Sequence, residues 1–67
     1  MTETNKEVVL AYAENNMNAV QTAKNAHFHL NTVNRNLDMV LERTGLNPRV
    51  FYDLVELVRI IKEEDQE

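Results

Sequence analysis

The segment from His27 to Leu46, HFHLNTVNRNLDMVLERTGL, is rich in side chains that can hydrogen-bond to nucleic-acid bases. An asparagine amide can pair with adenine, an arginine guanidinium can pair with guanine, and a threonine can contact a phosphate or a thymine methyl group. Asn31 and Arg35 stand four residues apart and would share the outer face of a helix, with Thr32 and Asn34 on its flanks. The segment therefore predicts a helix that reads double-stranded DNA.

The opposite face of the same segment is apolar. Five residues follow the spacing i, i+4, i+7, i+8 and i+11 that one helix face requires: Val33, Leu37, Val40, Leu41 and Thr44. We expect the helix to begin near Asn31 or Thr32, which are good caps, and to end at Thr44. Gly45 can adopt the left-handed conformation that ends a helix, and Leu46 can make the accompanying apolar contact.

A shorter helix should precede this one, at about residues 19 to 26. Asn18 is its expected N-cap, with Gln21 as the reciprocal partner. Its predicted inward residues are Val20, Ala23 and either Ala26 or His27. A small residue such as Ala23 lets two helices approach closely, and Phe28 supplies an apolar residue in the turn. The pair of helices is thus predicted to form a helix-turn-helix motif.

Two further helices complete the expected fold. The first covers about residues 3 to 15, and its inward residues are Val9, Tyr12 and Ala13, with Leu10 on the flank. The last begins at about residues 48 to 50, where an Asn-Pro pair suits a helix start. Its predicted core stripe is Val50, Leu54, Leu57, Val58 and Ile61, flanked by Phe51, while Val55 and Ile60 fall outside it. No alternating apolar pattern predicts a strand, so residues 1 to 67 should form one all-α, compact four-helix domain.

The charge distribution matters more than the total charge. The 67 residues carry a net charge of −4, with seven Lys and Arg against eleven Asp and Glu. Four of the acids, Glu63, Glu64, Asp65 and Glu67, lie in an expected solvated tail at about residues 63 to 67. The remaining seven acids match the seven bases, so the body of the domain is neutral and nucleic acid is not excluded as a partner.

Several other classes of protein are disfavoured. No apolar run is long enough to span a membrane and no cysteine is present, so a cytoplasmic protein is expected. His27 and His29 form an H-x-H pair without further ligands at a suggestive spacing, so no metal is expected. Asp53 and Glu56 are more simply the solvated face of a helix, and no nucleophile with a base stands out. We therefore predict neither an enzyme nor a cofactor.

The run from Thr22 to Leu46 resembles the C-terminal helix-turn-helix domain of the PucR/CdaR family of bacterial transcriptional regulators. The matching residues include an Ala-containing helix, the elements His29-x-Asn31-Thr32 and Thr44-Gly45-Leu46, and a following acidic-aliphatic helix, DLVEL. The resemblance covers about residues 16 to 60. It differs at Leu30 and Asn36, where the family usually has arginine. We expect Leu30→Arg and Asn36→Arg to restore contacts with DNA.

The residues and the resemblance together predict a sequence-specific, DNA-binding transcriptional regulator, or the DNA-binding domain of one. The expected DNA contacts are Thr22, Lys24, His29, Asn31, Thr32, Asn34 and Arg35, on a recognition helix at about residues 31 to 44. A homodimer through the fourth helix is also predicted, because Val55 and Ile60 lie outside the core stripe. The alternative is a protein-interaction module on the same fold that binds another regulator and not DNA. The family places this domain behind a larger effector domain, so the chain is expected to be an excised domain or a free-standing protein without its own sensor.

Overall fold

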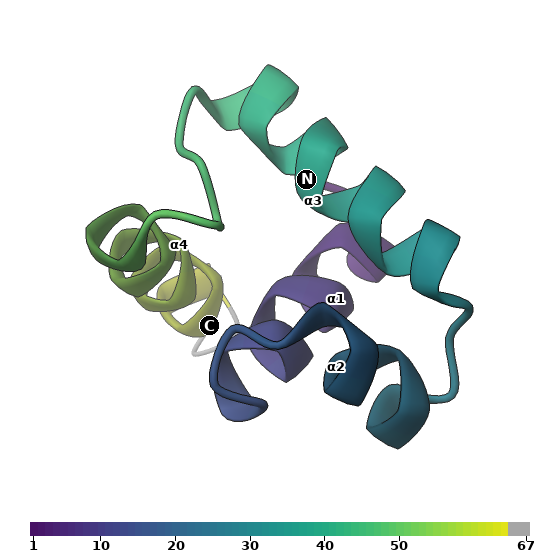
Figure 1. Ribbon diagram of the computed structural model, residues 1–67. Coiled ribbons are helices and arrows are strands. Elements are labelled where there is room, and N and C mark those ends of the chain that lie inside the picture. Colours follow the sequence, from purple (N-terminus) through teal and green to yellow (C-terminus); the bar gives the residue numbers. More distant parts are fainter. Residues whose placement is uncertain (65–67) are drawn as a thin grey trace.

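Four α-helices account for most of the chain in the computed structural model, which describes residues 1–64 (Figure 1). They are α1 (Glu3–Glu14), α2 (Ala19–Ala26), α3 (Leu30–Thr44) and α4 (Phe51–Glu64). The described residues form no strand, which confirms the all-α prediction. None of the helices among residues 1–64 combines the length and the apolar character that crossing a bilayer demands.

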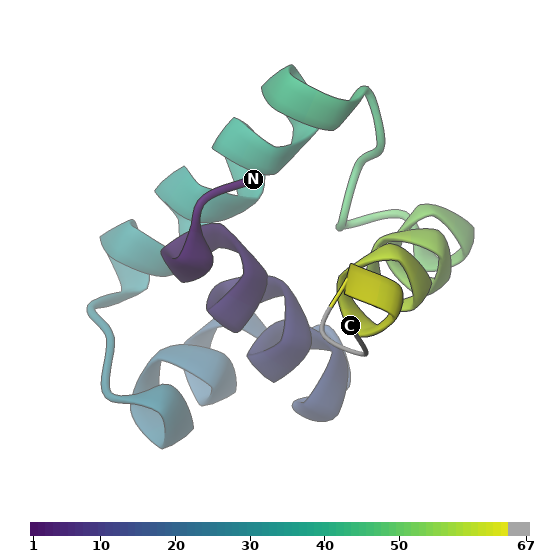
Figure 2. The same cartoon turned by 180° about the vertical axis from the view of Figure 1, so that it is seen from behind.

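Helix α1 is the centre of the fold, because it contacts each of the other three helices. Figures 1 and 2 show α2 and the beginning of α3 on one side of α1, and α4 on the other. Val8 and Val9 are fully buried and Tyr12 nearly so. The rest of the apolar core comes from the other helices: Ala23, Val33, Leu37, Val40, Leu54, Leu57 and Ile61. Helix α1 therefore offers an apolar surface to all three other helices, while α2 and α3 also pack against each other.

The helix ends explain why the chain turns where it does. Left-handed residues follow α1 at Asn16 and Met17 (φ 56° and 61°), end α2 at His27 (φ 61°) and end α3 at Gly45 (φ 75°). After α2, the Ala23 carbonyl accepts from two amides, that of His27 and that of Phe28 at 2.9 Å, which closes the end of the helix. The predicted glycine stop of α3 is confirmed, whereas the other two turns use residues that the sequence does not mark as clearly.

The starts of α2 and α3 test the capping predictions. The bounds of α2 are as predicted, and the Asn18 side chain accepts a hydrogen bond from the Gln21 amide at 2.9 Å. The Gln21 side chain does not complete the reciprocal bond, since it donates to Asn25. Helix α3 begins at Leu30 with His29 as its N-cap, and no side chain caps it. The prediction of Asn31 or Thr32 as the cap was therefore wrong.

The last helix starts one to three residues later than the predicted start at about residues 48 to 50. Asn47 to Val50 form a turn closed by a 2.9 Å hydrogen bond from the Val50 amide to the Asn47 carbonyl. The Asn47 side chain accepts from the Arg49 amide at 3.0 Å, so this asparagine stabilises the turn and not the helix. Helix α4 starts only at Phe51.

Several residues predicted to be in the core are exposed. Val20, Val50 and Phe51 are 65%, 47% and 60% exposed, and Leu41 is near the surface as well. Ala13, Leu10 and Val58 are half-buried and pack against the core. The apolar stripes are narrower than predicted because each helix turns only one strip of its surface toward the other helices.

A buried polar contact joins α1 to α3. Asn5 is fully buried, and its Nδ2 donates to Oδ1 of Asn36 at 2.6 Å. Asn36 is 7% exposed, and its own Nδ2 donates to the Thr32 carbonyl at 2.9 Å. Asn5 also completes a capping box with Thr2, since Oδ1 of Asn5 accepts from the Thr2 amide at 3.1 Å. Buried amides need such partners, so this chain of bonds restricts how α1 can slide along α3.

The two ends of the described chain are held together by an ion pair. The Lys6 ammonium lies 2.8 Å from the Glu64 carboxylate, which joins the first turn of α1 to the last residue of α4. Glu63 is also engaged, with Arg59 at 2.7 Å. Of the predicted solvated tail at 63–67, Glu63 and Glu64 are exposed but belong to α4, and residues 65–67 lie outside the described residues.

Removal of the Asn5 side chain should destabilise the domain. Asn5→Ala leaves the buried Oδ1 of Asn36 without a donor and opens the capping box, and we expect a loss of about 1 to 3 kcal/mol in the free energy of unfolding. Urea unfolding followed by circular dichroism measures it. Thr4→Ala, at an exposed position of the same helix, is the control and should change little.

A double variant shows whether the hydrogen bond itself matters. Asn5→Leu with Asn36→Leu replaces both polar partners by apolar groups of similar size, so it should be more stable than either single variant. Equal stability of Asn5→Ala and the parent protein would contradict a structural role for this contact.

The Lys6–Glu64 pair predicts an acid dependence of stability. The hydrogen bond and charge of Lys6 hold the pKa of Glu64 below its ordinary value of 4.5. Because the folded pKa is the lower one, the stabilisation is present above pH 4.5 and is lost as the pH falls through the folded pKa. Glu64→Gln should therefore lower the unfolding midpoint at about pH 7 and have less effect at about pH 3.

The matched control is Glu42→Gln, because Glu42 is exposed and has no cation within 4.0 Å among residues 1–64. An equal loss for Glu64→Gln at both pH values would refute the assignment to this ion pair.

Candidate nucleic-acid interface

Helices α2 and α3 contact each other and are joined by the three residues His27 to His29. His27 takes the left-handed conformation that ends α2, and Phe28 packs against the core from within the turn. Ala23 is buried at 7% exposure, as predicted for a crossing residue. This arrangement is a helix-turn-helix, with α3 as its second helix.

The outer face of α3 lies opposite its buried residues. Asn31, Arg35, Asp38 and Glu42 follow the spacing i, i+4, i+7 and i+11, so they lie along one line on the helix, and all four are exposed. This outer face of α3 is long, polar and free of contact with other helices. It has the size and the hydrogen-bonding groups that a helix needs to enter a major groove.

The structure keeps most of the predicted contact residues at the surface. Lys24, His29, Asn31 and Arg35 are exposed, and Thr32 and Asn34 are half-buried. Thr22 is different, because it is fully buried and its hydroxyl donates to the Asn18 carbonyl at 2.7 Å. The prediction that Thr22 contacts DNA was therefore wrong, since its hydrogen-bonding group is used within the first turn of α2.

The two positions where the sequence departs from the family pattern behave differently. Asn36 is buried and bonded to Asn5, so the expectation that Asn36→Arg would restore a DNA contact was wrong. An arginine there would break the α1 to α3 hydrogen bond instead of reaching outward. Leu30 is 41% exposed in the first turn of α3, so Leu30→Arg remains a prediction about DNA.

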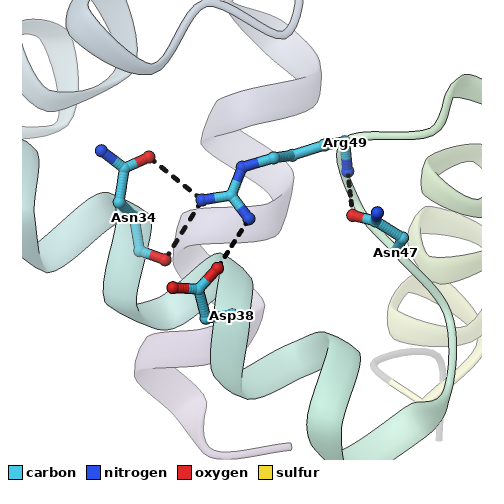
Figure 3. Close-up of polar contacts among 4 residues, drawn as sticks. All are labelled: Asn34, Asp38, Asn47 and Arg49. Atoms are coloured by element: carbon cyan, nitrogen blue, oxygen red, sulfur yellow. Dashed lines mark hydrogen bonds and ion pairs between the residues drawn. The ribbon is translucent and has the colours of Figure 1, made fainter.

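Arg49 adds a charged group to this surface that sequence reasoning missed. It comes from the turn between α3 and α4, and its guanidinium reaches back to α3 (Figure 3). Nη1 lies 2.8 Å from Oδ1 of Asp38, and Nη2 lies 3.1 Å from Oδ1 of Asn34 and 3.4 Å from its carbonyl oxygen. The residues are eleven and fifteen positions apart in sequence, so no helical spacing signals the contact.

The charge of the surface is close to balanced. Lys24, Arg35 and Arg49 face two carboxylates, Asp38 and Glu42, and the Asp38 charge is matched by Arg49. Arg35 has no carboxylate within 4.0 Å among residues 1–64. Arg35 is thus the cation of the outer face of α3 that is most available to a polyanion.

The histidines do not form part of a metal centre in the described residues. His27 ends α2 and His29 occupies the N-cap position of α3, and residues 1–64 contain no cluster of three or more potential His, Asp or Glu ligands. The conformations of both histidines are therefore explained by the turn.

Comparison with known families identifies the domain. The family model of the PucR C-terminal helix-turn-helix domain matches residues 6–59, from the first turn of α1 into α4. The match covers most of the chain, so the chain belongs to this family. Comparison with curated proteins and with solved structures found no match. The family is one of regulatory DNA-binding domains, which are not typically enzymes.

Proposed function

We propose that this member of the PucR C-terminal helix-turn-helix family is a sequence-specific transcriptional regulator, or the DNA-binding domain of one, with α3 as its recognition helix. The observation that carries the proposal is the exposed line of Asn31, Arg35, Asp38 and Glu42 on a helix held in helix-turn-helix geometry. Asn31 and Arg35 supply the groups that pair with adenine and guanine.

The neighbouring polar residues fit contacts with the DNA backbone. His29 and Thr32 lie at the start of α3, and Lys24 is exposed on α2, which would cross the backbone. Asn34 lies on the flank of α3. Such contacts set the register of the helix in the groove but carry no sequence information. Because a regulator of this kind must reach chromosomal DNA, we propose that it is located in the cytoplasm of a bacterial cell.

The second candidate function is a protein-interaction module that binds another regulator and not DNA. It is favoured by the near-neutral charge around α3, because phosphate contacts from Lys and Arg supply most non-specific affinity for DNA. Titration of the protein into a fluorescent duplex of mixed sequence at low salt separates the two. Binding that weakens as salt is added supports a DNA-binding domain, whereas no binding at low salt favours the interaction module.

Arg35→Ala should weaken DNA binding. If Arg35 pairs with guanine, the loss on a preferred duplex enriched from a random pool is about 1 to 3 kcal/mol, with relaxed selectivity at one base pair. Lys62→Ala is the control, because Lys62 is an exposed cation on α4. The converse change, Leu30→Arg, should steepen the salt dependence by about 0.9 in the log-log slope. Unchanged affinity for folded Arg35→Ala would remove this residue from the interface.

We also propose that the domain forms a homodimer through α4. The exposed residues Phe51, Tyr52 and Val55 lie at the start of this helix, and they are 60%, 82% and 50% exposed. Ala13, Asn16 and Met17 border the same region, where an open apolar groove of about 450 Å³ lies between α4 and the end of α1. Of the two residues predicted for the dimer, Ile60 is half-buried, so Val55 is the better candidate.

The position of α4 is compatible with DNA binding by a dimer. Figures 1 and 2 show α4 and the beginning of α3 on opposite sides of α1. Pairing through α4 would therefore leave the outer face of α3 accessible in both subunits. Helix-turn-helix dimers commonly read two half-sites about 34 Å apart.

Val55→Asp should convert the dimer into a monomer, because it places a charge in the middle of the apolar surface. Sedimentation equilibrium measures the change in mass. Val20→Asp is the matched control, since Val20 is 65% exposed on α2, away from α4. A parent protein that sediments as a monomer even at high concentration would contradict the proposal.

A further inference from the structure

The turn that follows α3 holds Arg49 in a fixed position. The Asn47 side chain accepts from the Arg49 amide at 3.0 Å, and the Asn47 amide donates to Oδ2 of Asp53 at 3.0 Å. Pro48, between them, is buried and has a restricted backbone angle. The Arg49 backbone is thus bonded to Asn47, which is itself bonded to the first turn of α4. The Arg49 side chain lies along the flank of α3, where it contacts Asp38 and Asn34 (Figure 3).

The partners of Arg49 place it beside the outer face of α3. Asp38 is one of the four residues on that face, and Asn34 is on the adjoining flank. A helix that lies in the major groove has phosphates along both flanks, and cations from neighbouring loops contact them. Arg49 brings a guanidinium to one flank from outside α3, a helix whose own Leu30 and Asn36 provide no charge.

The ion pair that holds Arg49 is open to solvent. The Asp38 side chain is 67% exposed and the Arg49 side chain 37% exposed. Exposed pairs of this kind contribute little to stability, because water and salt screen them. A phosphate can therefore take the place of Asp38 without a large loss, and a planar guanidinium suits two phosphate oxygens as well as it suits a carboxylate.

We propose that Arg49 is a DNA-backbone contact that Asp38 holds in place in the free protein and that exchanges this carboxylate for a phosphate when DNA binds. The inference rests on the proposed DNA-binding function and extends it to a residue outside the helix-turn-helix. Asp38 then has two opposing effects. It orients Arg49 before binding, and its negative charge lies close to the phosphate after binding.

The two partners should therefore respond in opposite directions. Arg49→Gln removes one phosphate contact per bound subunit, so the log-log salt slope should become shallower by about 0.9. The ratio of the parent's DNA affinity to that of Arg49→Gln should therefore fall by about 3.5-fold between about 50 and about 200 mM salt. Asp38→Asn removes the competing charge, while the new amide oxygen can still accept from the guanidinium and orient it, so this variant should bind the same duplex more tightly than the parent.

The experiment is a fluorescence titration of a mixed-sequence duplex at several salt concentrations, with each variant first checked for its thermal unfolding midpoint. Arg59→Gln is the matched control, because Arg59 is also an exposed arginine in ion pairs, with Glu56 and Glu63, but lies on α4. It should leave the affinity and the slope unchanged. Asp38→Asn should increase the DNA affinity less when it is introduced into Arg49→Gln than when it is introduced into the parent.

The outcomes separate the inference from the function on which it rests. If the parent binds duplex DNA and depends on Arg35, but folded Arg49→Gln keeps the same affinity and slope, Arg49 is only a brace for the turn and the inference is overturned. A purely structural pair also predicts that Asp38→Asn weakens binding or leaves it unchanged. If the parent binds no duplex even at low salt, the proposed function fails and Arg49 has no such role.

Discussion

The position of α3 depends on the surface of α1 against which it packs. Val8 and Val9 supply the apolar part of that surface, and the Asn5 to Asn36 hydrogen bond supplies a polar contact inside it. Apolar contacts alone tolerate small displacements, because burial depends on area and not on direction. A buried amide pair at 2.6 Å does not, since a shift of either helix would leave polar atoms without partners. This contact therefore sets where the outer face of α3 is presented.

The same contact explains how the chemistry of α3 is divided between its faces. On the inner face, Asn36 occupies a position where an outward cation was expected, and its amide forms hydrogen bonds within the fold. Charge then reaches the surface from elsewhere, because Arg49 extends from the following turn to Asp38. The surface proposed to contact DNA is consequently formed by residues of α2, α3 and the turn after α3, and not by α3 alone.

The near-neutral surface has a physical consequence for the proposed function. A DNA-binding helix with few cations would depend on base contacts and on a second subunit for its affinity, because each phosphate contact adds a salt-dependent increment. The exposed aromatic and aliphatic residues at the start of α4 suit that second requirement, since a dimer doubles the contacts made with DNA. The low charge on α3 and the apolar surface on α4 are thus both consistent with a domain that would bind DNA as a dimer.

Local signals in the sequence determined the helices themselves. The bounds of α2, the Asn18 cap and the glycine end of α3 follow from residues that act within one or two turns, and the helix-turn-helix and its family follow from their order. Tertiary structure alone decided which polar groups are available. Thr22 and Asn36 look like surface residues until the packing of the other helices buries them, and Arg49 approaches Asp38 only because the chain reverses after Gly45. Helical periodicity gives the direction of a side chain on its own helix, whereas burial and long-range ion pairs depend on what the other helices place beside it.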